Sequence, residues 1–335
     1  MKKILTGGLL MAVMMTATAA PITAQAQTAS EQEVIALQLQ VVELLQRLIS
    51  ILTGQSHDDM MMGNEMMSDD SMMTEGEYTL TLNTDLAELS EGYYEGWLIV
   101  GDEKISTGLF QEGGEYTMKF DTSIADVEKV VITIEPEVDE DAGPSGIIVL
   151  AGDVVDGEVD LAFPVDFSEA AGSAILATPT DGNSEDETSG VWFLSLADGS
   201  PAVSLDLPEL PAGWLYEGWG VYEGTPLTTG TFASGDMADS FDGFSGTEAD
   251  APPFPGEDFL MNAPDGVEFP VDLADGESLA VISVEPDLDG VDPTGAGPAQ
   301  VKPLVAHIEA GQDDHADFEL ELNLDSVPSG TATLR

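Results

Sequence analysis

The sequence contains no cysteine and has only eight lysines and arginines and three histidines among its 335 residues. The absence of cysteine excludes disulfide bonds, thiol nucleophiles and thiolate metal sites, so a folded domain must be stabilised by its packed core. The scarcity of basic residues removes the positive footprint that nucleic-acid binding requires, and we expect no nucleic-acid partner. The chain also has neither a Gly-x-Ser-x-Gly elbow nor a His-Glu-x-x-His pair, so we expect no enzymatic activity.

Acidic residues are abundant instead. The 64 aspartates and glutamates give a formal net charge of −56 and are spread along the chain. Concentrated salt screens the self-repulsion of such a surface, so the composition indicates adaptation to brine. Binding of divalent cations is the competing interpretation of the same composition.

Long apolar runs are also lacking. No stretch of 18 or more apolar residues follows the N-terminal segment, so we expect no transmembrane span. Residues 1–26 have the pattern of a cleavable signal peptide: Lys2 and Lys3 precede an apolar run over residues 4–15, and Ala24-Gln25-Ala26 forms the cleavage site. The sequence therefore predicts export to the periplasm, the cell surface or the medium.

Residues 30–54 are predicted to form a helix. Ser30 can cap its start, Glu33 completes a capping box, and Gly54 ends it. Apolar residues over 34–52 follow a heptad spacing, and a second apolar row lies beside the first. An arc this wide favours a homo-oligomer of three or more helices, with attachment to a membrane surface or packing on the protein's own domain as alternatives.

Residues 55–77 read as a disordered linker of low complexity, rich in Met and Asp. Thioethers are soft donors, so this segment could bind Cu(I) or Ag(I) through its methionines and one histidine. The alternative is a spacer whose methionines contact neighbouring chains or scavenge oxidant. The candidate soft-metal ligands are His57, Met60, Met61, Met62, Met66, Met67, Met72 and Met73.

Apolar and polar residues alternate with a period of two beyond the linker, as in strands with one wet face. The alternation covers residues 78–82, 159–163, 203–207 and 318–324. Gly, Pro and Asp turns separate these strands, and no helical pattern lies between them. The sequence therefore predicts an all-β fold of antiparallel, immunoglobulin-like β-sandwich modules.

The strongest feature is an internal repeat. Tyr94-Glu95-Gly96-Trp97 recurs as Tyr216-Glu217-Gly218-Trp219, an offset of 122, whereas VVITIEP at 130–136 recurs as AVISVEP at 280–286, an offset of 150. The difference of 28 residues places an insertion at about 234–265 of the second copy. We therefore predict two tandem modules, at 78–165 and 174–326.

The repeated aromatic residues predict a hairpin whose tryptophan and phenylalanine anchor the core. The sharper alternative is a carbohydrate-binding module in which Trp97 or Trp219 stacks against a sugar. The insertion, rich in Phe and Pro, could bind a ligand or could cover an open edge of its own sheet.

Acidic turns offer a calcium hypothesis. Asp287, Asp289 and Asp292 lie around Gly290, and Glu137, Asp139 and Asp141 form a similar turn in the first copy. They supply the hard oxygen ligands that Ca²⁺ prefers, although neither turn has the twelve-residue EF-hand pattern.

The strings YEGWLIVGDEKISTGLF and VVITIEPEVDEDAGPSGIIVLAG resemble the extracytoplasmic C-terminal domain of the anti-sigma-K factor (RskA) family. The resemblance covers about residues 78–163 well and the second copy more loosely. It implies an all-β extracytoplasmic domain with a sensing or regulatory role and no catalytic residues. The sequence shows neither the cytoplasmic helical domain nor the membrane span of such factors, so we expect a structural or interaction protein that is not itself a sigma-factor inhibitor.

Overall fold

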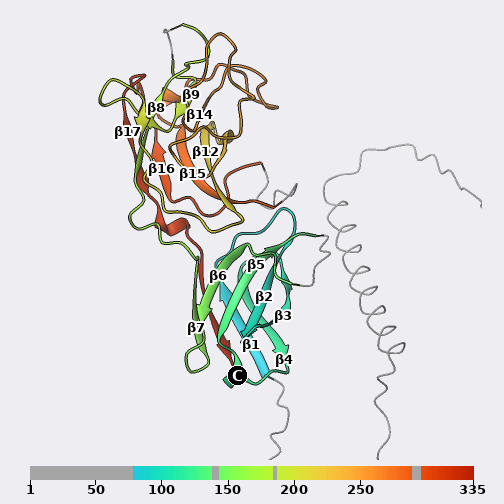
Figure 1. Ribbon diagram of the computed structural model, residues 1–335. Helices are drawn as coiled ribbons and strands as arrows, with labels where there is room; N and C mark the ends of the chain where they lie inside the picture. The colour runs from blue at the N-terminus through green and yellow to red at the C-terminus, as the bar shows by residue number, and fades with distance from the viewer. Residues whose placement is uncertain (1–77, 138–142, 184–186, 289–295) are drawn as a thin grey trace, which may run out of the picture. The chain divides into compact units, whose positions relative to one another are not determined.

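The computed structural model describes residues 78–335 except 138–142, 184–186 and 289–295 (Figure 1). This part is all-β, as the sequence predicted: its regular elements are strands and three short 3-10 helices. None of its helices is long and apolar enough to cross a membrane. The predicted signal peptide, the helix at 30–54 and the linker at 55–77 lie outside the described residues.

The first module is an eight-stranded antiparallel sheet with the order β3-β2-β5-β6-β7-β18-β1-β4. Its elements are β1 (Tyr78–Thr84), β2 (Tyr93–Val100), β3 (Glu103–Phe110), β4 (Gly114–Phe120), η1 (Ile124–Asp126), β5 (Lys129–Glu135), β6 (Ile148–Asp153), β7 (Glu158–Ala162) and, from the far end of the chain, β18 (Ser329–Leu334).

The second module has an eight-stranded sheet with the order β13-β12-β15-β16-β17-β8-β9-β14, and β10 and β11 form a separate ribbon beside it. Its elements are β8 (Gly172–Leu176), β9 (Gly190–Trp192), β10 (Leu194–Ser195), β11 (Ala202–Val203), β12 (Trp214–Tyr222), β13 (Thr225–Phe232), β14 (Gly256–Asp258), η2 (Leu273–Asp275), β15 (Leu279–Pro286), β16 (Leu304–His307), β17 (Phe318–Leu322) and η3 (Leu324–Ser326).

Each sheet rolls into a barrel-like shape. In the first module the rings of Phe110 in β3 and Tyr116 in β4, the two edge strands, lie 4.8 Å apart. In the second, Ser240 N donates to Thr231 O in β13, and the preceding Asp239 accepts from Gly256 N in β14. The all-β class is confirmed, whereas an immunoglobulin-like pair of facing sheets is not confirmed.

The alternating strands point one row of side chains into the core, as expected for a half-buried sheet. Leu80 and Leu82 of β1 are fully buried, while Thr79 and Thr81, which alternate with them, are only partly buried. The predicted alternations at 78–82 and 159–163 fall on β1 and β7. The one at 318–324 falls on β17 but runs on into η3, and its Leu322 and Leu324 are exposed. At 203–207 only Val203 lies in a strand, and Leu205 packs in a loop against Gly172 and Gly235.

The modules are nested rather than strictly consecutive. The second module lies in sequence between β7 and β18, and β18 returns to the first sheet, where it pairs with both β7 and β1. In this respect the structure differs from the tandem arrangement that the repeat predicted. η3 ends at Ser326, and residues 329–334 pair within the first sheet.

The insertion of the second copy packs on its own module. It contributes β14, which pairs with β9, and Phe259, which is fully buried. Rings of Phe241, Phe244 and Phe269 form a contact chain with Phe259. Of the two interpretations of this segment, the structure favours cover of a sheet edge.

Candidate functional site

The repeated Tyr-Glu-Gly-Trp motif has a structural role at every position. The hydroxyls of Tyr94 and Tyr216 donate to carbonyls of the preceding loop, those of Ala87 (2.9 Å) and Pro208 (2.6 Å). The glutamates accept from a hydroxyl on the neighbouring strand, Ser106 in β3 and Thr228 in β13. These bonds connect β2 and β12 each to the preceding loop and to the neighbouring strand.

The glycine of the motif belongs to a β-bulge. Pairing of β2 with β3 shifts between Gly96 and Trp97, opposite Thr107-Gly108, and the second module repeats the shift at Gly218. A Cβ at Gly96 would lie 2.4 Å from Thr107 Oγ1, so no larger residue fits without a shift. The bulge accounts for both the Gly of the motif and the repeated Thr-Gly.

The tryptophan of the motif begins a hydrogen-bond relay. Trp97 Nε1 donates to Thr133 Oγ1 (2.9 Å), this hydroxyl donates to Glu135, and Glu135 accepts from Ser145 N at 3.0 Å. The second module repeats the relay through Trp219, Ser283, Glu285 and Ala299 N. Each buried glutamate thus accepts a hydrogen bond from the backbone N–H of the residue that follows Gly-Pro, at the end of an acidic loop.

The burial and hydrogen bonding of the two tryptophans argue against the carbohydrate-binding hypothesis. Trp97 is 3 % exposed and Trp219 is 5 % exposed, and each indole N–H is already used inside its module. Neither ring offers a free face on which a sugar could stack. The core interpretation of both tryptophans therefore holds.

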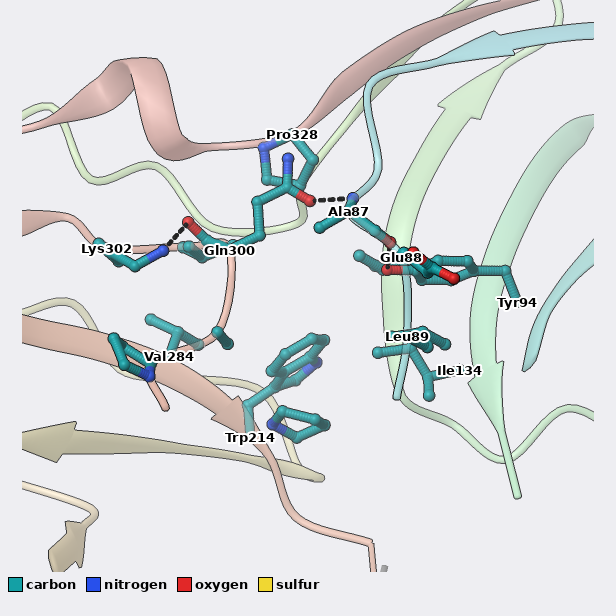
Figure 2. A pocket seen from close by; sticks show the side chains of 15 residues that line it. Ala87, Glu88, Leu89, Tyr94, Ile134, Trp214, Val284, Gln300, Lys302 and Pro328 are labelled. Carbon is teal, nitrogen blue, oxygen red and sulfur yellow. Dashed lines mark hydrogen bonds between the residues drawn. The ribbon is translucent and has the colours of Figure 1, made fainter. Parts of the chain in front are cut away.

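A pocket of about 270 Å³ lies where the two modules meet (Figure 2). Leu89, Tyr94 and Ile134 of the first module line it together with Trp214 and Val284 of the second. Most of the lining is apolar, so the pocket suits a small apolar group.

Gln300 fastens this junction. Its side-chain oxygen accepts from Ala87 N at 2.7 Å and its side-chain nitrogen donates to Asp85 O at 2.8 Å. One side chain of the second module thus satisfies two backbone groups of the first. The Trp214 ring also packs edge-on against Phe163, which follows β7, at 5.2 Å between ring centres.

Lys302 supplies a positive charge at the same pocket. Its Nζ lies 3.4 Å from Gln300 O, and burial lowers the pKa of its ammonium group, opposed by the Glu285 carboxylate. The pocket therefore combines apolar walls with one cation.

Buried carboxyl groups gather at β14. Glu257 and Asp258 are fully buried, and Asp239 contacts the strand through Gly256. Asp258 is well satisfied, since it accepts from Trp192 Nε1 (2.8 Å) and from Thr180 N (2.7 Å). Burial raises the pKa of Asp239 to about 6.

Glu257 differs from its neighbours, because neither of its carboxylate oxygens has a hydrogen-bond partner among the described residues. Burial raises its pKa to about 8, and the nearby Asp239 and Asp258 carboxylates add to this. The Ser245 side chain lowers the pKa, although it lies outside good hydrogen-bond geometry. A carboxyl group in these surroundings is held in its neutral form at neutral pH.

The predicted metal ligands are mostly outside the described residues. His57 and the seven linker methionines lie there, as do Asp289 and Asp292 of one acidic turn and Asp139 and Asp141 of the other. Asp287 directly follows β15 and donates its N–H to Gly213 O (2.8 Å). The described ranges contain no group of three or more His, Asp or Glu side chains placed to hold a metal ion.

The two described histidines lie apart from these features. His307 is exposed at the end of β16, and His315 Nε2 lies 3.1 Å from the buried Glu187 carboxylate. Sequence reasoning missed Gln300 and the carboxyl groups at β14. The relay could have been found, because VVITIEP and AVISVEP share a hydroxyl and a glutamate at matching places.

Fold and motifs together define a protein with two all-β modules of one architecture, each built around the same buried Tyr-Glu-Gly-Trp hairpin. Residues 8–148 match the family model described as "Anti-sigma-K factor rskA, C-terminal". The match agrees with the resemblance seen in the sequence, and the matched range includes β1 to β5 of the first module. No curated protein and no solved structure matches the chain.

Proposed function

We propose that the chain is an exported, non-enzymatic structural or interaction protein of the cell envelope, which presents two anti-sigma-K-factor-like β modules and does not itself inhibit a sigma factor. The observation that carries the proposal is the family match together with the structural use of the repeated motif residues, of which the tyrosines, glycines and tryptophans are buried. The duplicated residues stabilise the fold of each module, so we assign the modules a role in display or in contact with other proteins. The acidic composition fits a salt-rich environment.

Self-association through residues 34–52 is part of this proposal. The test is light scattering in concentrated salt, comparing a mature chain that starts at Gln27 with a version that starts at Tyr78. A trimer or larger assembly for the first and a monomer for the second supports an assembly helix that carries the modules. Two monomers refute the oligomer and redirect the search to membrane or protein docking of the helix.

Ligand sensing at the junction pocket is a second candidate, favoured by its apolar lining and by Lys302. The probe is anilinonaphthalene sulfonate, an apolar anion whose fluorescence rises in such sites. Ala87→Phe should occlude the pocket and abolish the signal, because exposed Ala87 lies on its lining, whereas Ala202→Phe, exposed outside the lining, should not. Equal signals in both variants exclude this site.

The soft-metal alternative rests on the seven linker methionines and His57 alone. Titration of the full chain with Cu(I) or Ag(I), repeated after all seven methionines are changed to leucine, tests it. Loss of binding supports a metal buffer, and unchanged binding removes it.

A further inference from the structure

Each sheet is completed by a strand that directly follows the strands of the other module in sequence. In the first sheet β18 lies between β7 and β1, and in the second sheet β8 holds the same place, between β17 and β9. In sequence, however, β8 follows β7 and β18 follows β17. The strand that would close each module in a simple tandem array therefore closes the other one.

The two closing strands are equivalent in sequence and register. They read Gly-Ser-Ala-Ile-Leu in β8 and Gly-Thr-Ala-Thr-Leu within β18. In the first module Gly330 lies opposite Leu161 and Ala332 opposite Val159. In the second, Gly172 lies opposite Leu320 and Ala174 opposite Phe318. Both strands thus occupy the same kind of seat, and we call the place between β7 and β1 the first-module seat.

Side chains on the outer face explain why each strand occupies its own seat. Ile175 of β8 points away from the main core into a second buried cluster with Trp192, which Phe254 covers. The equivalent residue of β18 is Thr333, opposite Thr81 on a partly exposed face. In the first-module seat, Ile175 would lose its contacts with Trp192 and Phe254. In the second sheet, the hydroxyl of Thr333 would be buried without a hydrogen-bond partner. The first-module seat is therefore specific for β18.

Attachment of β18 depends mainly on its backbone. It pairs along both sides, with β1 and with β7, while only Ala332 and Leu334 of its side chains are buried. The strand carries no charged side chain, in a chain whose net charge is −56. A strand of this kind can be supplied by another molecule without bringing like charges into the sheet.

We propose that the first-module seat is a strand-binding site that a second copy of the chain fills with its own β18, so that two copies exchange closing strands. Every contact of β18 in the seat is the same whichever copy supplies it, and the difference lies only in chain connection. Repulsion between two strongly acidic chains opposes the exchange in dilute buffer. Concentrated salt screens that repulsion and favours the exchanged pair.

The lack of native cysteine makes a cross-linking test clean. Thr81 and Thr333 are opposite partners in β1 and β18. Full-length Thr81→Cys and Thr333→Cys chains are mixed unfolded, refolded together at high protein concentration in concentrated salt and then oxidised. We expect a covalent dimer joined between positions 81 and 333, identified by peptide mass mapping, with a severalfold lower yield in dilute buffer.

The matched control uses Ile99→Cys and Lys104→Cys chains, because these positions face each other in the β2–β3 hairpin, which is not exchanged. If the copies associated through any other interface, both mixtures would cross-link to the same extent. A double Thr81→Cys/Thr333→Cys chain measures closure within one molecule. The proposal is overturned if the 81/333 mixture cross-links no more than the control while the double variant forms its disulfide within one chain.

Discussion

Replacement of Glu257 by Gln gives the sharpest test of the buried carboxyl group at β14. The glutamate is fully buried, its oxygens lack partners among the described residues, and its pKa is raised from 4.5 to about 8. The folded state therefore holds a proton that the unfolded chain releases between these two pH values. Because the folded state binds more protons there, the free energy of unfolding falls as pH rises through this window and levels off above it.

The size of the effect follows from the shift. About 3.5 pH units at about 1.4 kcal/mol per unit give an upper bound of about 5 kcal/mol for this group. Glu257→Gln removes the titration while keeping nearly the same shape. The variant should match the parent chain near pH 4.5 and exceed its stability by about 2–5 kcal/mol above pH 8.

Chemical unfolding in concentrated salt, from pH 4.5 to 9, measures this difference. Glu277→Gln serves as the matched control, because Glu277 is exposed in the same module, and its profile should run parallel to that of the parent chain. Parallel profiles for Glu257→Gln and the parent would refute the reasoning. So would a variant that is destabilised equally at every pH.

Three further predictions test the motif and the junction. Gly218→Ala places a Cβ 2.3 Å from Thr229 Oγ1 and should lower the free energy of unfolding by about 1–3 kcal/mol in denaturant titrations; an unchanged midpoint would contradict the bulge argument. Ser283→Ala leaves the Trp219 N–H without its acceptor and should cost about 1–3 kcal/mol, whereas a neutral result would mean that the relay is dispensable. Gln300→Ala removes the acceptor of Ala87 N, so hydrogen exchange at that amide should accelerate, and an unchanged rate would show that this bond does not hold the junction.

The hairpins and the repeat could be predicted because their signals are local. In both copies Tyr bonds the preceding loop, Gly lies at the bulge and Trp begins the relay, so the spacing of the three residues is the same. The strands at 78–82, 159–163 and 318–324 follow from alternation, which needs only one buried face.

The nesting of the modules could not be predicted in the same way. Alternation shows that a strand exists but does not name its partner, and β18 pairs with strands that lie far away in sequence. The strand predicted at 203–207 is wrong beyond Val203 for a related reason, since Leu205 is buried by packing against glycines that are distant in sequence, while Val203 is exposed. The rolled sheet, the junction pocket and the burial of Glu257 depend on such distant contacts as well.

The return of β18 also sets an order of events during synthesis. Residues of the first module emerge first, but their sheet lacks the strand between β7 and β1 until residues 329–334 have appeared. The second module has all its strands by residue 322 and can finish earlier. The module that begins first is thus completed last, and a chain interrupted before β18 would leave a module with two unpaired strand edges, open to aggregation.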